Sequence, residues 1–161
     1  MAIPGYMWLV DNQGQPIHGT VKIKQRENSV EVLSCQHRIH LPTDDDTGSA
    51  MSTRKHEPFT LLKTLCSTSP ILYKACCDGK TLQQVKLQWY KIDTNGAERP
   101  YFQQTLLQAK VVSIGPKIPN TKDKLSEKLG HLEEVQFRYE TIRWAYLDGN
   151  IMAQDTWLEK T

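Results

Sequence analysis

The sequence predicts a mainly β protein, in which two β-sheets form a barrel-like sandwich with one short α-helix and a long extended loop. Three observations indicate this fold class. Apolar and polar residues alternate over many short stretches, as they do in strands that bury one face. Turn-forming pairs separate these stretches, most clearly Asn-Gly at residues 95–96 and Asp-Gly at residues 148–149. Helical spacing with helix-end residues occurs at residues 69–79.

Four strands are expected in the first half of the chain. The first covers residues 6–10 and ends in the turn sequence DNQG, whose Asn and Gly tolerate the left-handed backbone of a tight reversal. The second covers residues 17–24, where apolar residues alternate with lysines. Residues 30–41 are expected to form a longer strand, and residues 59–65 a short one.

The strand at residues 30–41 changes parity part of the way along. Its second half alternates cleanly, whereas Val30 and Val32 lie on the other face, so we expect a bulge near Leu33. One face of the second half is apolar, with a histidine at the edge of the core, and consists of Leu33, Cys35, His37, Ile39 and Leu41. The opposite face is small and polar, and its residues are Ser34, Gln36, Arg38 and His40.

A long polar loop is predicted over residues 42–55. It has no apolar periodicity and includes three consecutive aspartates at residues 44–46. A structureless loop of this length in a compact domain is usually functional or disordered. The aspartates lack the spacing of an EF-hand, so a calcium site is not expected there.

The helix is predicted from its two ends and one apolar face. Ser69 can cap its first turn, Pro70 suits its first position and Gly79 suits its exit. The apolar face consists of Ile71, Leu72, Ala75 and Cys76. Cys77 is expected to be more exposed than its neighbour Cys76, because adjacent helical side chains diverge by about 100°.

The second half of the chain is expected to return to strands. Residues 82–92 and 101–114 flank the Asn-Gly turn as a hairpin, residues 132–144 form one further strand, and a last short strand ends at Trp157. No internal repeat or second-domain boundary interrupts residues 1–161, so we expect a single domain.

Charge and composition exclude several classes of protein. The 161 residues carry 20 Lys and Arg against 18 Asp and Glu, a formal net charge of +2. This balance argues against a nucleic-acid partner and against membrane insertion, and no stretch reaches the roughly 20 apolar residues of a transmembrane helix. The N-terminus lacks the basic leader of a signal peptide, so we expect synthesis in the cytoplasm, where the four cysteines stay reduced.

Metal and catalytic chemistry find little support in the motifs. In the sequence CQHRIH, Cys35 and His37 share a strand face but His40 lies on the other, and no further ligand pair completes a zinc site. The sequence contains neither a nucleophile elbow nor a phosphate-binding loop. The neighbours Glu133 and Glu134 would point to opposite strand faces, which makes a poor acid–base pair. We therefore expect no catalytic residue, no metal and no cofactor.

A structural or binding role is favoured, with two alternatives. An enzyme with a site inside the barrel would need a convergent cluster of titratable groups in a pocket. A β-sandwich binding module, monomeric or oligomeric, would be distinguished by its assembly state.

Three segments of the chain together resemble one protein family. The segment RKHEPFTLLKTLCSTSPILY is similar to the R-x-H-x-P-F, Lys and S-P-x-L-Y signature of the haemolysin-coregulated protein (Hcp) family. The matching residues are Arg54, His56, Pro58, Phe59, Lys63, Ser69, Pro70, Leu72 and Tyr73. The start, YMWLVDNQGQPIHG, resembles the opening strand and turn of the family, and the end, TIRWAYLDGNIMAQDTW, resembles its closing hairpin. The residues outside the pattern include Cys66, Cys76 and Cys77.

The resemblance implies a structural part of the type VI secretion system. Members of the family form homohexameric rings that stack into an inner tube inside a contractile sheath. The tube is expelled with the spike protein (VgrG) at its tip, and its lumen carries and protects effector proteins. The protein would assemble in the bacterial cytoplasm and then be secreted. The fused C-terminal toxin of some members is not expected, because the sequence stops soon after Trp157.

The resemblance also implies two groups of contact residues. The family's extended loop, residues 41–56 here, would project from the barrel and contact the adjacent ring. The expected stacking residues are Asp44, Asp45, Asp46, Arg54, Lys55 and His56. The polar face of the strand at residues 30–41 is expected to line the lumen, with an outer wall against the sheath as the alternative. Its residues are Ser34, Gln36, Arg38 and His40.

Overall fold

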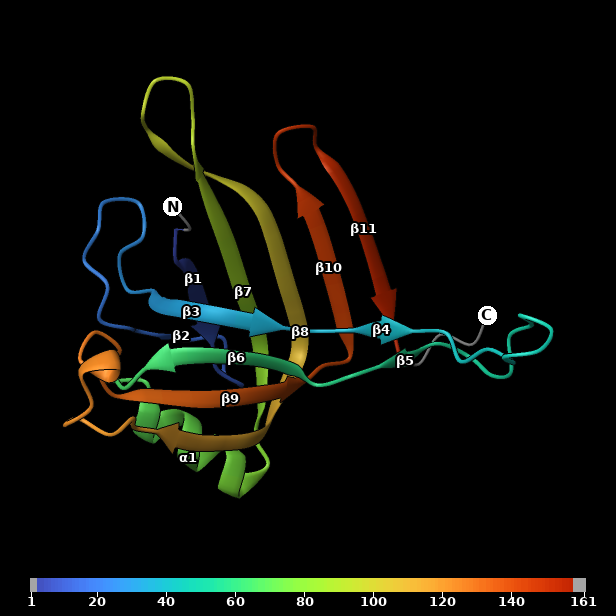
Figure 1. The fold of residues 1–161 in the computed structure, drawn as a ribbon, viewed down its shortest axis with the longest axis horizontal. Helices are drawn as coiled ribbons and strands as arrows, with labels where there is room; N and C mark the ends of the chain where they lie inside the picture. The colour runs from blue at the N-terminus through green and yellow to red at the C-terminus, as the bar shows by residue number, and fades with distance from the viewer. Residues whose placement is uncertain (1–2, 158–161) are drawn as a thin grey trace.

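Six antiparallel strands close into a barrel within residues 3–157, the part of the chain that this computed structural model describes (Figure 1). Their bounds are Gly5–Val10 (β1), Val30–Gln36 (β3), Phe59–Thr64 (β6), Thr81–Ile92 (β7), Glu98–Lys117 (β8) and Leu132–Arg138 (β9). The strands follow one another around the wall in the order β8, β7, β1, β3, β6 and β9. Because β9 pairs back onto β8, the wall is closed.

Further elements are attached to this wall. β10 (Thr141–Tyr146) pairs with β8, and β11 (Ile151–Thr156) pairs with β10, so the sheet extends past the barrel. β2 (Pro16–Ile17) pairs with the end of β1. The helix α1 (Ser69–Asp78) packs against β8, and a short 3-10 helix, η1 (Lys124–Ser126), lies between β8 and β9.

The predicted fold class is confirmed, and the structure adds how its two sheets are arranged. The barrel wall is one continuous sheet closed on itself. The second sheet is small: β4 (Ile39–His40) and β5 (Lys55–His56) pair at the base of a hairpin that projects away from the barrel (Figure 1). The predicted helix and the hairpin around the Asn-Gly turn correspond to α1 and to β7 with β8.

Closure of the barrel depends on β8, which is long enough to pair with two partners along one side. Through Leu107 it pairs with β10, and from Lys110 onward it pairs with β9. Between these stretches Gln108 has a φ of 51°, in the left-handed region. The register between β8 and β9 then shifts between Val111 and Ser113. Such local breaks bend a strand, so the second half of β8 can turn away from the first and meet β9.

The single strand predicted over residues 132–144 is wrong because of this bend. The structure has two strands there, β9 and β10, separated by a corner at Tyr139 and Glu140. The Glu140 N–H donates to the Leu107 carbonyl at 3.0 Å, which fixes the corner at the point where β8 changes partner. The alternation breaks at this corner, because the next buried residue after Tyr139 is Ile142, and the prediction of a single strand did not take this break into account.

The barrel interior is filled by apolar side chains from all six wall strands. The largest fully buried ones are Phe59, Phe137, Met7, Leu61, Leu87 and Leu106. On α1, Leu72 and Ala75 are buried and Cys76 packs partly against the core, as expected. Ile71 was expected on the same face but is exposed, since the helix rests on the barrel along a narrower stripe than the predicted one.

The bulge predicted near Leu33 is confirmed, and Cys35 lies on the core face as expected, but the assignment of Leu33 to that face is wrong. The register between β3 and β6 shifts between Val32 and Ser34, so Leu33 is the extra residue. Leu33 is 40% exposed, whereas Val30 and Val32 are buried before it and Cys35 packs against the core after it. The bulge therefore lets residues of both parities share the inner face.

The strand predicted over residues 17–24 is also wrong, apart from its first residue, Ile17, which belongs to β2. Gly19 passes so close to the backbone of Ser29 that an added Cβ would lie 2.2 Å from the carbonyl oxygen. The segment folds back on itself as a series of turns instead of continuing as a strand. The buried Arg26 holds these turns against the barrel by stacking over two tyrosine rings and by an ion pair at 2.7 Å.

A buried ion pair links β6, β9 and the start of α1. Lys63 and Glu133 face each other across the two strands, their side chains are fully buried, and their charged groups are in direct contact. Ser69, the first residue of α1, donates its hydroxyl to Glu133 at 2.7 Å and lies 3.2 Å from the Lys63 ammonium. This use of Ser69 corrects the predicted cap, because the N-cap is Thr68, without a side-chain cap hydrogen bond. The pair ties the helix to the strand that closes the barrel.

We expect Glu133→Gln to lower the free energy of unfolding by about 3–5 kcal/mol, because it leaves the Lys63 ammonium buried without its counter-charge. The matched control is Glu134→Gln, since Glu134 pairs with Lys117 at the surface and such pairs contribute about 0–1 kcal/mol. Denaturant unfolding of both variants measures the two costs. Equal costs would contradict the assignment of a stabilising buried pair.

Candidate functional site

The hairpin at residues 39–56, which we call the arm, is the most prominent surface feature of this barrel. β4 and β5 pair at its base over two residue positions. Beyond them, a bridge between Thr43 and Ala50 holds its two sides together. The predicted polar loop is thus an ordered hairpin, and it extends away from the barrel wall (Figure 1).

The tip of the arm is organised by an aspartate that bonds to its own turn. The Asp44 carboxylate accepts the backbone N–H groups of Thr47 and Asp46 at 3.0 and 2.8 Å, and these hydrogen bonds lower the pKa of Asp44. Gly48 has a φ of 72°, in the left-handed region that glycine adopts readily, and donates to the Asp44 carbonyl at 2.8 Å. The tip therefore presents acidic side chains on a defined turn.

Two exposed apolar side chains flank the acidic tip. Leu41 and Met51 are 52% and 69% exposed. Leu41 was expected in the core, and this is wrong because the chain has already left the barrel wall at that position. Apolar side chains beside charged ones on a projecting element are typical of a contact surface.

A chain of hydrogen bonds joins the base of the arm to the barrel, and we call it the arm-base chain. Its members, in order, are His37, Tyr139, His56, Asp155 and Arg54. The Tyr139 hydroxyl lies 2.9 Å from His37 Nε2 and 2.5 Å from His56 Nδ1. Asp155 Oδ2 lies 2.6 Å from His56 Nε2 and accepts from Arg54 Nε at 2.7 Å. The chain thereby connects β5 with β11 and with the corner between β9 and β10.

The arm-base chain contains the residue types of a catalytic triad but lacks its access. Tyr139 is 6% exposed, and two imidazoles already contact its oxygen. Burial raises the pKa of the Tyr139 hydroxyl, and the nearby Asp155 carboxylate raises it further. A buried hydroxyl that is held neutral is not an activated nucleophile, so the geometry supports a structural role.

The six predicted stacking residues divide between the tip and the base of the arm. The three aspartates at residues 44–46 lie at the tip, and Lys55 is exposed on β5. Arg54 and His56 belong instead to the arm-base chain, and His56 is 4% exposed. These two residues hold the arm from inside the subunit.

The four predicted lumen residues do not lie on one continuous strand. Ser34 and Gln36 are exposed on β3, which ends at Gln36. Arg38 lies beyond this end and pairs with Glu57 at 2.8 Å. His40 is half-buried on β4, and its Nδ1 is buried without a hydrogen-bond partner among residues 3–157. The first two residues therefore belong to the barrel wall, whereas Arg38 lies just before the arm and His40 lies at its base.

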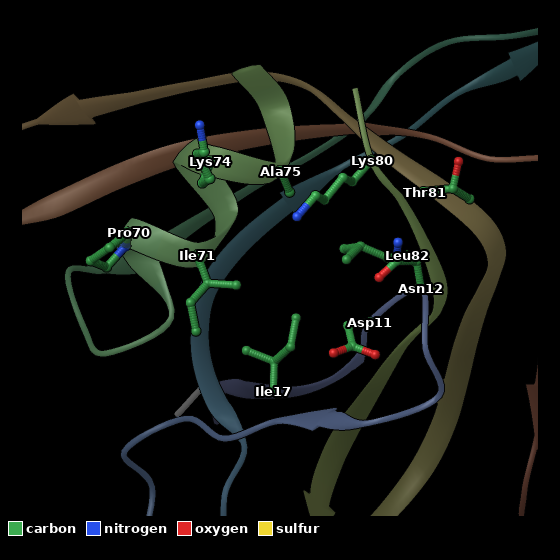
Figure 2. Close-up of a pocket in the computed structure, with 10 residues that line it drawn as sticks. All are labelled: Asp11, Asn12, Ile17, Pro70, Ile71, Lys74, Ala75, Lys80, Thr81 and Leu82. Carbon is green, nitrogen blue, oxygen red and sulfur yellow. The ribbon is translucent and has the colours of Figure 1, made fainter. Parts of the chain in front are cut away.

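A pocket of about 340 Å³ opens beside α1 (Figure 2). Ile17, Ile71 and Leu82 surround it with apolar side chains, and Asp11 and Lys80 add charged groups. Its ten lining residues include no His, Cys or Ser. The pocket thus lacks a Ser–His or Cys–His pair, although the Asp11 carboxylate and the Thr81 hydroxyl are among its lining groups.

The cysteines and acidic residues form no cluster with metal-binding geometry in the part of the chain that the structure describes. Among residues 3–157, no helix is both long and apolar enough to cross a membrane. Cys35, Cys66 and Cys76 are partly buried and Cys77 is exposed, and all four thiols are free. Burial raises the pKa of the Cys35 thiol to about 12, which keeps it in its unreactive form.

Reasoning from the sequence missed the residues that complete the two polar clusters. A signal for Lys63 existed, because it follows Phe59 and Leu61 at the inward parity of β6. A lysine at such a position indicates a buried counter-charge. Tyr139 and Asp155 carry no comparable signal, because one lies at a corner and the other on an edge strand.

Comparison with known proteins adds a second kind of observation. Residues 6–146 match the family described as "Type VI secretion system effector, Hcp". The chain is 28% identical over 166 residues to the "Major exported protein" of Pseudomonas aeruginosa, and the match covers 98% of this chain and 96% of that protein.

Two solved structures extend the comparison. The Hcp1 protein from the E. coli EAEC 042 pathovar is 43% identical, with a TM-score of 0.87 and coverage of 97% of this chain and 99% of that one. The secreted protein Hcp3 from Pseudomonas aeruginosa is 24% identical, with a TM-score of 0.79 and the same coverage. The second likeness concerns the fold alone.

We expect Asp44→Ala to loosen the tip of the arm without changing global stability, because the hydrogen bonds of the Asp44 carboxylate within residues 3–157 all lie in its own turn. Hydrogen exchange at the Asp46 and Thr47 amides should accelerate about tenfold, while the thermal midpoint shifts by less than about 1 °C. The matched control is Asp45→Ala, which removes an equal charge from the exposed tip. A loss of several degrees in Asp44→Ala would show that the tip supports the barrel.

Proposed function

The chain belongs to the Hcp family of the type VI secretion system, and on that basis we propose that its hexameric rings stack into the inner tube of that system. Hcp tube proteins are structural and not enzymatic, and the family implies hexameric tube assembly. The observation in this chain that carries the proposal is the arm. It is an ordered hairpin that projects from the barrel and carries exposed acidic and apolar side chains at its tip.

Ring formation needs an interface between two different surfaces of the subunit, repeated until the ring closes. β11 is suited to one side of it, because it forms an edge of the sheet. Ile151 and Met152 on this strand are both largely exposed. An edge strand with exposed apolar side chains can pair with another chain. An interface in a ring would bury these side chains and pair the free backbone groups of the edge.

Stacking of one ring on the next is assigned to the arm. The aspartates at residues 44–46 and Lys55 provide exposed charges, while Leu41 and Met51 provide apolar contact area. Charged contacts of this kind would set the register between rings more than the affinity. Arg54 and His56 would act from the base by fixing the direction of the arm.

The polar face of β3 is assigned to the lumen. Ser34 and Gln36 are small and polar, so they suit a wall that holds different effector proteins without a fixed apolar patch. Arg38, just before the arm, and His40, at its base, would line the rim. The tube would carry the spike protein (VgrG) at its tip, lie inside the contractile sheath, and leave the bacterial cytoplasm with its effectors through the secretion system.

A β-sandwich binding module, monomeric or oligomeric, is the alternative, and the pocket beside α1 favours it (Figure 2). Its volume of about 340 Å³ is at the lower end for small-molecule sites. The two functions differ in assembly state, because a tube requires hexamers that stack. A particle mass together with a stacking assay therefore distinguishes them.

We expect the intact protein to form a hexamer of six 18.5 kDa chains, as measured by size-exclusion chromatography with light scattering. A variant in which a short turn replaces residues 43–52 should keep this mass, and its thermal midpoint should shift by less than about 2 °C, because the arm pairs with itself beyond its base. The variant should lose ring stacking, seen by electron microscopy, and should lose secretion.

The same experiment contains its own counter-evidence. A purely monomeric intact protein would contradict the tube function. A shortened variant that fails to fold would place the arm in the core of the barrel, and a shortened variant that still stacks would remove the arm from the ring contact.

We expect Gln36→Trp to reduce effector retention while sheath assembly continues, because Gln36 is an exposed wall residue assigned to the lumen. Retention is measured by co-purification of effectors with rings, and sheath assembly by fluorescence microscopy in cells. The matched control is Lys110→Trp, at an exposed position on β8. Unchanged retention combined with failed sheath assembly would place the β3 face on the outer wall.

A further inference from the structure

The arm-base chain admits one arrangement of its hydrogens when both histidines are neutral. The Asp155 carboxylate only accepts, so the hydrogen between it and His56 belongs to His56 Nε2. A neutral His56 then has an unprotonated Nδ1, which accepts the hydroxyl hydrogen of Tyr139. The Tyr139 oxygen has no second hydrogen, so it accepts from His37 Nε2. Every donor in the chain therefore meets one acceptor.

Burial makes this arrangement sensitive to added protons. His56 and Tyr139 are both almost fully buried. Burial lowers the pKa of His37, and the neighbouring His56 lowers it further, while Glu57 acts in the opposite direction. The pKa of Asp155 is also lowered, mainly by the hydrogen bond from Arg54 and then by the one from His56, against the effect of burial.

Few other charged groups lie next to the arm-base chain. Arg138 donates to the His56 backbone carbonyl at 2.8 Å and lies 5.5 Å from the Trp157 ring. The Trp157 ring stacks on His56 with a centroid distance of 5.0 Å. Glu57 is occupied by its ion pair with Arg38. Among the ion pairs and hydrogen bonds of residues 3–157, Asp155 is the one carboxylate in contact with His56.

We propose that the arm-base chain is a proton-controlled latch, which clamps the arm to the barrel while both imidazoles are neutral and releases it when they are protonated. The clamp joins three places that are distant in the sequence. His56 lies on β5 of the arm, Tyr139 at the corner after β9, and Asp155 on β11. The latch itself is independent of what the arm contacts, whereas its consequence for the tube rests on the proposed function of the arm in stacking.

Protonation of both histidines is incompatible with the hydrogen bonds of the arm-base chain for a geometric reason. A second proton on His56 must sit on Nδ1, which points at the Tyr139 oxygen from 2.5 Å. The Tyr139 hydroxyl would then have to turn toward His37, whose Nε2 can accept it only while that ring is neutral and carries its hydrogen on Nδ1. With both rings protonated, two N–H donors face one oxygen, the hydroxyl hydrogen has no acceptor in the chain, and two cations lie side by side. Separation of the arm from the barrel relieves all three conflicts.

The direction of the pH effect follows from the two lowered pKa values. A lowered His37 pKa means that the folded arm favours the neutral ring, so this stabilisation is fully present above the ordinary value of 6.5 and is lost as the pH falls toward the lowered one. The lowered Asp155 pKa adds a second loss below its ordinary value of 3.8. Attachment of the arm therefore weakens in mild acid and weakens again in strong acid.

Hydrogen exchange in the intact protein tests the latch directly. The Glu57 amide reports on it, because it donates to the Arg38 carbonyl beside the base of the arm. After correction for intrinsic exchange rates, its protection relative to the barrel core should fall about tenfold between about pH 7.5 and about pH 5. Tyr139→Phe removes one oxygen and should give the low protection at both pH values. The matched control, Tyr90→Phe, removes a hydroxyl bonded to Gln88 and should behave as the unsubstituted protein.

A second measurement needs no substitution and covers the case in which Tyr139→Phe does not fold. Nitrogen-15 NMR of the histidine rings should show hydrogens on Nε2 of both His37 and His56 at about pH 7.5. A charged His56 at that pH, protection that does not change with pH, or pH dependence that persists in Tyr139→Phe would overturn the latch.

Failure of the latch and failure of the stacking function give different results. Sedimentation of rings and stacks over the same pH range supplies the comparison. Protection and stacking that fall together support both the latch and the proposed function. Protection that falls while stacking continues supports the latch and contradicts the role of the arm in stacking. Protection that is constant overturns the latch, whatever the stacks do.

Discussion

Pairing of the second half of β8 with β9 closes the barrel, and the position of every attached element depends on that closure. The bend near Gln108 frees the first half of β8 to pair with β10. The chain must therefore turn sharply at Tyr139 after closing the barrel, and the sheet then extends outward to β11. This extension carries Asp155 to the base of the arm, where it meets His56. A strand bend in the wall thus determines where the arm is anchored.

Two polar clusters inside the subunit perform comparable tasks at different places. Lys63 and Glu133 join the start of the helix to the closing strand, and the arm-base chain joins the arm to the corner and to β11. A buried ion pair often adds little stability over a well-packed apolar pair, because desolvation offsets the attraction. Our interpretation is that both clusters select one arrangement of elements, since the charged and polar groups that pair in them come from segments distant in the sequence and meet in that arrangement.

The sequence was sufficient for features that local patterns define, and insufficient where distant segments decide the outcome. Alternation and the Asn-Gly turn predicted the β7–β8 hairpin, and a parity change predicted the bulge at Leu33. Leu33 itself was assigned wrongly to the inward face, because the extra residue of a bulge does not follow the alternation of the strand around it. Ser69 looks like a helix cap locally, yet its hydroxyl serves Glu133 on a strand far along the chain. The partners of His56 are equally distant in the sequence, so no local motif predicts the hydrogen bonds of the arm-base chain.

The order of strands around the wall also has a kinetic consequence. β1 pairs with β7, so that Tyr6 lies opposite Gln88, and the final seam needs β9, which ends at Arg138. Contacts between segments so far apart form slowly, because the chain must first lose the entropy of a long loop. During synthesis on the ribosome, the β7–β8 hairpin can form early, whereas the cylinder stays open until residues through 138 have emerged. Until then the edges of β6 and β8, which β9 later covers, stay exposed, and the nascent chain depends on protection from premature association.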